Sequence, residues 1–502
     1  MFKTIKYSLM ALTALSMLQA CTKEEVLELT PEFTLDGLNN PSNMDQIEQV
    51  LLGAYAGFRN ANYYGSGSGT GAGWSLMPDV LSDNLFESGS SLANSRAMAD
   101  WTFNQNTTQI TTFYSAPYAV IANANVVLRD IDKFTTTANQ GRANRLKGQA
   151  LAIRALAHFD LFRYFAPRFD RNSNDPAVAY VKEFILPSPN AVQPPRMTNK
   201  EFYDNLFADL SEAVRLLQNV DRAINASSAL TRPYIDLAGA YAIQARTSLY
   251  AGQWADAITA ATEAIDRRPL VNGVTNPAAF AGMYNETNRG EIIWNVQFEA
   301  GQSGPTFLVY FATNQRSYFR PALEIADTLG TGGLVRSNDV RYSTYFTQIN
   351  DGTVSRGLAL TKYRGKGATV SDGNANFPAI RTGEMYLIRA EARARSGQDV
   401  LALQDLNTLR ANRITGNLPL VLVGAPLLEA IANERRAELI GEGHRFFDLK
   451  RTTRTIQRGS TCGTSQSPAG DCRLEPNDRE WALPIPETVV RANTNQAQNS
   501  GY

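Results

Sequence analysis

Residues 433–451 read NERRAELIGEGHRFFDLKR, a stretch in which clustered charges alternate with apolar residues. Three of its glutamates recur at every fourth position: Glu434, Glu438 and Glu442. This spacing places the carboxylates on one face of a helix, where Arg435 and Arg436 are near enough to pair with them. The aromatic pair that follows is expected to bury the turn after this helix. The stretch therefore predicts an ion-paired structural helix.

The same stretch holds His444 among several carboxylates, so an enzymatic interpretation has to be weighed. We favour the structural one, because ion pairs along the helix account for the charges. The other histidine of the chain, His158, falls inside an apolar helix, where a core position is expected. No His-x-Glu-His, Cys-x-x-Cys or Gly-x-Ser-x-Gly pattern occurs, so neither metal nor serine-hydrolase chemistry is indicated. A glycosidase needs two positioned carboxylates, and no motif argues for them.

The first twenty residues have the order of a bacterial secretory signal. A short lysine-bearing region precedes a mostly apolar run over residues 7–18, which is too short to span a bilayer as a mature helix. Small residues and Cys21 follow, as in a lipoprotein signal whose cysteine is acylated and becomes the new N-terminus. We expect residues 1–20 to be a removed signal peptide and residues 21–42 to be a lipidated tether. The alternative is an ordinary cleaved signal peptide with an incidental cysteine.

Charge and cysteine content narrow the class of protein. Lys plus Arg equals Asp plus Glu, at 48 each, so the chain does not point to nucleic acid or anionic lipid as a partner. Cys462 and Cys472 lie ten positions apart and can close a disulfide in an oxidising compartment; two free thiols are the alternative. No apolar run after Cys21 approaches 18 residues, so no later membrane span is expected.

Helical periodicity predicts an α-helix at about residues 44–60 and then a series of helix pairs with small residues at their packing positions. The pairs are 123–131 with 146–165, 202–217 with 235–250, 235–250 with 255–265, and 382–396 with 400–412. The last two read as an Ala-rich helix, a Gly turn and an amphipathic helix, which is the tetratricopeptide plan. Long insertions separate the pairs, so an open solenoid is not expected.

The insertions differ from the helix pairs in composition. Residues 269–380 are rich in Gly, Asn, Pro and aromatic residues and contain short β-like runs such as 292–298. We therefore predict a mainly α fold, in which a tetratricopeptide-like helix-pair scaffold carries a loop-rich, partly β, ligand-facing lobe. Function tends to reside on such loops when a rigid scaffold holds them.

Neutral polar ligands such as sugars suit aromatic and amide side chains, because a ring packs on a sugar's C–H face and amides bond its hydroxyls. We therefore take as candidate ligand contacts the ring-bearing and polar residues near the loops. They are Tyr63, Tyr64, Trp74, Asp83, Asn84, Trp101, Trp294, Tyr310, Tyr318 and Arg320. Trp254, at the turn of a helix pair, and Trp481, near the C-terminus, are expected to be structural.

Two stretches carry a resemblance to a known family. Residues 433–451, together with WALPIPE at 481–487 and QNSGY at 498–502, resemble the two recurrent signatures of the SusD/RagB family. Ser500 replaces the usual Pro, and Gly441 stands where Phe is common. The resemblance covers essentially the whole mature chain, and it implies one SusD-like domain over residues 43–502, with an N-terminal part to about 270 and a C-terminal part from about 271.

The resemblance also implies a function. Family members are surface-exposed outer-membrane lipoproteins that sit over a SusC-type TonB-dependent β-barrel transporter and pass it a captured glycan or peptide. The helix-pair side would face the barrel, and the loop-rich side would help to hold the ligand. Lys23-Glu24-Glu25, directly after Cys21, resembles the acidic signal that exports lipoproteins of the Bacteroidetes to the cell surface.

We therefore predict a non-enzymatic nutrient-capture lipoprotein of the outer membrane that binds a glycan and delivers it to a SusC-type barrel. Neither a cofactor nor a metal is expected, and nucleic acid is not an expected partner. Three alternatives remain open: an oligopeptide-capturing member of the same family, a helical-repeat adaptor that binds only protein, and a surface glycosidase. The adaptor would be favoured if no cleft were lined by two or more aromatic residues.

Overall fold

The computed structural model describes residues 40–65, 73–184, 193–218, 220, 232–299, 302, 304, 316–350, 357–363, 365–366, 375–459, 462–463 and 471–502. The predicted signal peptide, Cys21, the tether up to residue 39 and Tyr310 lie outside the described residues.

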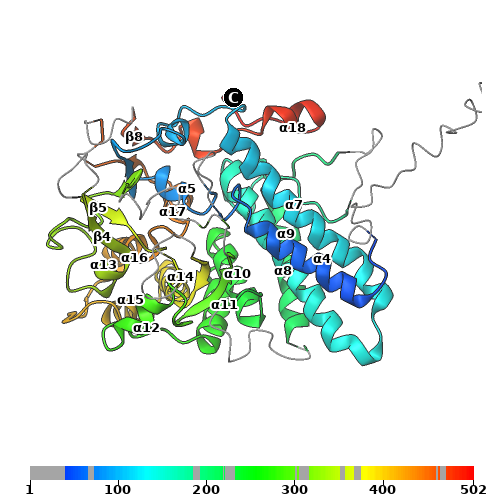
Figure 1. The fold of residues 1–502 in the computed structure, drawn as a ribbon, viewed down its shortest axis with the longest axis horizontal. Helices are drawn as coiled ribbons and strands as arrows, with labels where there is room; N and C mark the ends of the chain where they lie inside the picture. Colours follow the sequence, from blue (N-terminus) through cyan, green and yellow to red (C-terminus); the bar gives the residue numbers. More distant parts are fainter. Residues whose placement is uncertain are drawn as a thin grey trace, which may run out of the picture.

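Long helices form a continuous array in which successive helices pack against one another. They are α4 (Met44–Phe58), α7 (Thr108–Asp130), α8 (Gln140–Phe165), α9 (Asn199–Leu217), α10 (Leu237–Tyr250), α11 (Trp254–Arg267), α14 (Thr382–Arg395), α15 (Asp399–Ala411) and α16 (Gly424–Leu439). Figure 1 shows α4, α7, α8 and α9 on one side of the molecule, with α10, α11 and α14 in the middle and α15 and α16 beyond them. The predicted helix pairs are confirmed, and the fold is mainly α.

Small residues allow the close packing of this array. A Cβ atom at Gly148 of α8 would lie 2.8 Å from Cγ of Leu217, so the glycine lets α8 and α9 approach each other closely. The turns of the two tetratricopeptide-like pairs are made by Gly252 (φ +69°) and Gly397 (φ +77°), a backbone conformation that favours glycine. The Gly turns read from the sequence are therefore present between α10 and α11 and between α14 and α15.

The strands are short and form four separate two-stranded antiparallel sheets. The pairs are β1 (Leu85–Glu87) with β3 (Phe319–Pro321), β2 (Ile292–Val296) with β6 (Phe377–Arg381), β4 (Phe346–Ile349) with β5 (Gly357–Leu360), and β7 (Ile456–Gln457) with β8 (Arg473–Leu474). Short helices accompany them: α5 (Met77–Val80), α6 (Arg96–Ala99), α12 (Pro277–Gly282), α13 (Val340–Tyr345), α17 (Arg445–Arg451) and α18 (Glu487–Ala492). Three of the sheets draw strands from the 269–380 insertion, as the partly β lobe predicts.

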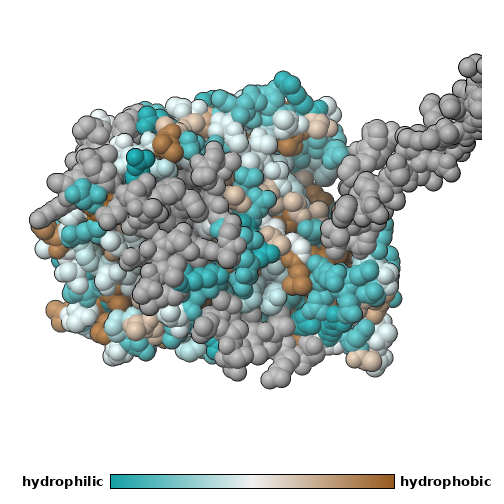
Figure 2. Space-filling view, viewed as in Figure 1, coloured by the Kyte–Doolittle hydropathy of each residue, from teal (hydrophilic) through white to brown (hydrophobic). Residues whose placement is uncertain are grey.

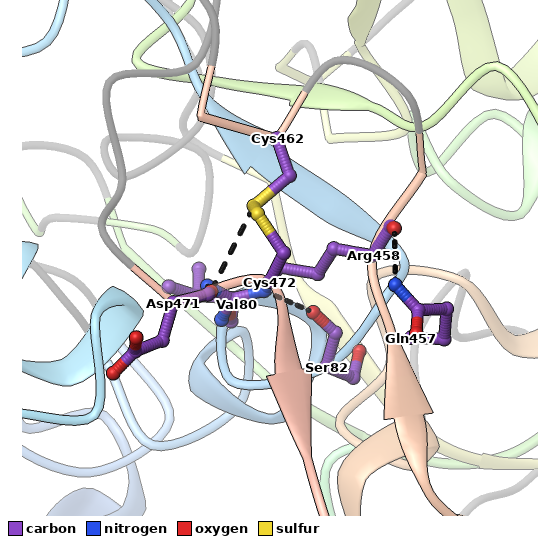
Figure 3. The surroundings of a disulfide bond; sticks show 7 residues. All are labelled: Val80, Ser82, Gln457, Arg458, Cys462, Asp471 and Cys472. Carbon is purple, nitrogen blue, oxygen red and sulfur yellow. Dashed lines mark hydrogen bonds between the residues drawn. A yellow bond between two sulfur atoms is a disulfide. The ribbon is translucent and has the colours of Figure 1, made fainter.

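Cys462 and Cys472 form a disulfide beside the β7–β8 pair (Figure 3). The backbone N–H of Arg458 donates to the carbonyl of Cys472 over 2.9 Å. The guanidinium of Arg458 donates to the carbonyls of Val80 and Ser82. The pairing expected from the sequence is therefore present, and it lies where the C-terminal segment joins the α5 region.

Residues 433–451, the charged stretch described above, contribute to a buried network of ion pairs. Glu438 on α16 accepts hydrogen bonds from Arg341 (2.9 Å), Arg413 (3.0 Å) and Arg381. Neither Glu438 nor any of these arginines is more than 1 % exposed. Burial opposes ionisation of Glu438, but the three guanidiniums hold its pKa well below the ordinary value. The network therefore fastens α16 to β6, α13 and the end of α15.

The structural role expected of residues 433–451 fits this network, but the expected ion-pair partners were wrong. Arg435 pairs with Asp448 (2.8 Å), and Arg436 donates to Asn84 Oδ1 (2.8 Å). Glu442 also differs from the expectation, because α16 ends at Leu439 and Glu442 lies in the turn after it. Glu434 and Glu438 take their partners from distant segments because both side chains are buried, and long-range contacts replace the i, i+3 pairs of an exposed helix.

His158 occupies the core position expected for it, within α8. The N–H of Val181 donates to its Nε2 (2.9 Å), so the proton of the neutral ring is on Nδ1, which donates to the carbonyl of Arg154 (2.8 Å). Burial lowers the pKa of His158 to about 3. The neutral ring is thus fully hydrogen-bonded, and adding a proton would remove the acceptor that Val181 needs.

We predict that His158 makes the protein less stable in acid. The pKa of His158 in the folded protein lies below the unfolded value of about 6.5, so His158 changes the free energy of unfolding little above pH 6.5. Below that pH, only the unfolded state binds the proton. The free energy of unfolding therefore falls by about 2 kcal/mol between pH 7.5 and pH 5. Denaturant unfolding at both pH values should show this loss shrinking in His158→Gln. An equal loss in the variant and the unmodified protein would contradict the assignment.

Candidate ligand-binding site

Four rings that we expected to contact a ligand lie inside the core instead: Tyr63, Tyr64, Trp74 and Trp294, none more than 2 % exposed. The hydroxyls of Tyr63 and Tyr64 both donate to Asp160, over 2.7 and 2.9 Å. The indole N–H of Trp294 donates to the carbonyl of Pro233. Because their faces pack against other rings, these side chains are not placed to stack on a sugar, which corrects the expectation from sequence.

A buried ion pair stands at the centre of this aromatic cluster. The guanidinium of Arg163 contacts Asp160 over 2.5 Å and lies 4.7 Å from the ring centre of Trp74 and 4.8 Å from that of Phe447. Stacked rings compensate a cation that burial has removed from water. Phe447 belongs to the charged stretch 433–451, so the aromatic cluster joins that stretch to the segment around Trp74.

The polar candidates near the α5 region also have structural partners. Asp83 receives two hydrogen bonds from Arg445 (2.8 and 2.9 Å), and Asn84 receives one from Arg436. Trp101 is 4 % exposed and donates its indole N–H to the carbonyl of Leu81. The guanidinium of Arg458 lies 3.8 Å from its ring centre. These three side chains hold loops together, which their neighbourhood in the sequence could not reveal.

Arg320 lies in β3 of the β1–β3 ladder, on the loop-rich side, and Tyr318 lies directly before that strand. Ser88 donates its backbone N–H to the carbonyl of Tyr318 (2.8 Å), and Phe86 is the register partner of Arg320. Arg320 is 4 % exposed, whereas Tyr318 is only half-buried. Tyr318 is therefore the one candidate ring, among those the structure describes, that keeps an accessible surface.

The structure also contains a large cleft that the sequence did not predict. Its volume is about 1040 Å³, and it lies between the end of α8, the α10–α11 turn, α17 and the C-terminal residues. Four aromatic residues line it: Phe169, Tyr250, Trp254 and Trp481. Trp481 is buried and donates to the carbonyl of Glu475, as expected of a structural residue, but Trp254 is half-buried on the wall. The only sequence signal for this cleft was a tryptophan directly after a Gly turn.

A second hollow, of about 470 Å³, lies between α7 and α18, near the C-terminus in Figure 1. Three rings line it, with several amide side chains around them: Tyr114, Tyr118, Phe184, Asn125, Gln193, Asn493 and Gln496. Each of the two hollows is lined by at least two aromatic residues. The absence of such a cleft, which would have favoured a protein-only adaptor, is therefore not observed.

Within the described ranges, no group of three or more His, Cys, Asp or Glu side chains is arranged to hold a metal ion. None of the helices described is both long enough and apolar enough to cross a membrane.

Comparisons with known proteins agree with this architecture. A family model described as the SusD family matches residues 306–502, and one described as "Starch-binding associating with outer membrane" matches residues 43–249. The chain belongs to the SusD/RagB family. Its similarity to SusD-like protein P38 of Formosa agariphila is 24 % identity, over 91 % of this chain and 93 % of the relative.

Solved structures of the SusD superfamily share the fold. One from Bacteroides thetaiotaomicron covers 91 % of this chain and 99 % of its own, with a TM-score of 0.77 and 23 % identity. A protein from Bacteroides vulgatus described as a putative sugar binding protein is 26 % identical, with a TM-score of 0.74, and covers 92 % of this chain and 99 % of its own. The chain therefore has the fold of the SusD superfamily.

Proposed function

We propose that this SusD-family protein is a cell-surface lipoprotein that captures a glycan and delivers it, chemically unchanged, to a SusC-type TonB-dependent transporter. The observation that carries the proposal is family membership across both halves of the chain. The two hollows lined by aromatic and amide side chains offer further places for sugar contacts, apart from the Tyr318 surface described next. Rings bind the C–H faces of sugars, and amides bind their hydroxyls. The solved relative described as sugar binding supports the same ligand class.

On the loop-rich side, we place the glycan against Tyr318. Its ring keeps accessible surface directly before β3, two residues from Arg320 and near in sequence to Tyr310. The buried rings around Trp74 would serve this site only indirectly, by holding the scaffold. One stacked ring and a few hydrogen bonds give modest affinity, on the order of micromolar, which favours release to the transporter.

An apolar surface on the helix-pair side supports the transporter as a partner. Four aliphatic side chains on α15 and on the loop before α16 are strongly exposed: Val400 (80 %), Leu418 (82 %), Val421 (89 %) and Val423 (67 %). The backbone N–H of Gly424 donates to Asp399, which joins the two segments. Figure 2 shows hydrophobic residues at the lower-left edge, near α15 in Figure 1. Such patches commonly mark protein or membrane contacts, and lipid on Cys21 would hold the protein at the outer membrane.

A binding screen tests the glycan proposal. Affinity electrophoresis of the purified protein against a panel of neutral and acidic polysaccharides should retard it in at least one gel. We expect Tyr318→Ala to weaken that binding about three- to tenfold, the range for loss of one aromatic contact, and Tyr318→Phe to preserve it. Tyr241→Ala, which removes a half-buried ring from α10, is the control. Unretarded migration in every gel would contradict glycan capture.

A further inference from the structure

The 1040 Å³ cleft has a wall with an unusual charge distribution. Seven basic side chains line it, against only two acidic ones, Asp170 and Asp478. Several of the arginines have carboxylate partners, but these partners are not part of the wall. Arg451, for example, pairs with Glu391 and Asp448, and Arg454 pairs with Glu429. The wall itself therefore carries more basic than acidic side chains, and the carboxylates that pair with Arg451 and Arg454 belong to residues outside it.

Three cations on this wall keep donors for a ligand. Arg168 is exposed and has no ion pair within the described part of the chain. Arg395 donates through its Nε to Glu391 over 2.8 Å, and neither of its terminal nitrogens has a hydrogen-bond partner among the residues that the structure describes. Lys450 caps α8 by donating to the carbonyls of Arg163 (3.1 Å) and Ala166 (2.6 Å), but among the described residues no carboxylate neutralises it. A bound anion would supply the missing counter-charge.

An aromatic face accompanies these cations. Trp254 is half-buried on the cleft wall, and the guanidinium of Arg395 lies 5.5 Å from its ring centre. Burial lowers the pKa of Lys450 well below its ordinary value and so favours the neutral amine, whereas a bound anion would favour the ammonium form. A ring next to several guanidiniums can hold a sugar by its C–H face and an acidic substituent by paired hydrogen bonds.

We propose that this cleft is a binding site for an anionic oligosaccharide, one that carries carboxylate or sulfate groups, with Trp254 against a sugar ring and Arg168 and Arg395 on its acidic groups. The saccharide nature of the ligand rests on the proposed function, whereas its negative charge rests on the wall of the cleft. The site is separate from Tyr318, which does not line the cleft.

The test compares matched polysaccharide pairs that differ only in charge. Native and carboxyl-reduced polygalacturonate test the carboxylate, and native and desulfated carrageenan test the sulfate. Calorimetry of the purified protein should show at least one charged member binding about tenfold or more tightly than its neutral counterpart. Arg168→Glu and Trp254→Ala should each weaken that binding about tenfold. Arg215→Glu on α9 makes the same charge change outside the cleft and should alter it less than about twofold.

The outcomes separate this inference from the proposed function. Equal binding of both members in each pair would overturn it, as would equal losses in Arg168→Glu and Arg215→Glu. Binding of acidic poly-glutamate peptide in place of any polysaccharide would also overturn it. Binding of neutral glycans that depends on Tyr318 and ignores the cleft variants would leave glycan capture standing without this site. Absence of all glycan binding would contradict both the proposed glycan capture and the proposed cleft site. Thermal unfolding of each variant verifies that it is folded.

Discussion

Replacing Glu438 with alanine should lower the free energy of unfolding by about 3–5 kcal/mol, the range for breaking a buried ion pair from one side. Arg341, Arg381 and Arg413 all donate to this carboxylate, and none of the three is more than 1 % exposed. Glu291, Glu434, Glu442 and Asp339 also pair with these arginines, but Lys362 shares Glu442 and Arg410 shares Glu434. Removing Glu438 therefore leaves five cations with four carboxylates in a buried site. Denaturant unfolding followed by circular dichroism measures the change.

An exposed ion pair provides the control for Glu438. Glu212 on α9 pairs with Arg215 over 2.6 Å, but both side chains are largely accessible, at 39 % and 63 %. Exposed pairs contribute about 0–1 kcal/mol, so Glu212→Ala should have little effect. Similar losses in the two variants would show that the buried network does not fasten α16 to the rest of the fold.

Replacing Trp74 with alanine should also cost about 3–5 kcal/mol of stability, because it removes a large buried ring. Trp74 is 1 % exposed and packs against Tyr64, Tyr164 and Phe447. Its loss also uncovers the guanidinium of Arg163, which lies 4.7 Å from the indole. Thermal or denaturant unfolding should register this loss, with Trp74→Phe retaining part of the stability because a ring remains.

Trp254→Ala is the matched comparison for Trp74→Ala. It removes the same side chain from a half-buried position on the cleft wall, so its effect on stability should be about 1 kcal/mol or less. The sequence predicted Trp74 as a ligand contact and Trp254 as a structural residue; Trp74 is buried in the core, whereas Trp254 keeps accessible surface. A stable Trp74→Ala protein that has lost glycan binding would contradict the assignment of Trp74 to the core.

The helices were predictable because their signals are local. Apolar positions such as Ile47, Val50 and Leu51 recur at helical spacing, and all three are buried on α4. The turns at Gly252 and Gly397 were readable for the same reason, since a left-handed turn favours glycine wherever the rest of the chain lies. Family membership followed from two contiguous signatures, which need no knowledge of distant contacts.

The candidate site was harder to predict because it depends on contacts that are distant in the sequence. Tyr63 and Trp74 flank a Gly-rich stretch and so resembled ligand-facing rings, yet Asp160 and Arg163, about ninety residues later, enclose them. Arg436 lay beside the glutamates in sequence but reaches Asn84. The large cleft combines six separate segments, so no window of sequence could show it.

The central claim is that the protein binds glycan without transforming it. Isothermal titration of the purified protein with the polysaccharide that retards it most, and in parallel with a peptide mixture, tests this most directly. We expect saturable heat with the glycan, with a dissociation constant on the order of micromolar, no heat with peptides and no release of reducing ends during the titration. Heat with peptides alone, or reducing ends that accumulate with time, would contradict it.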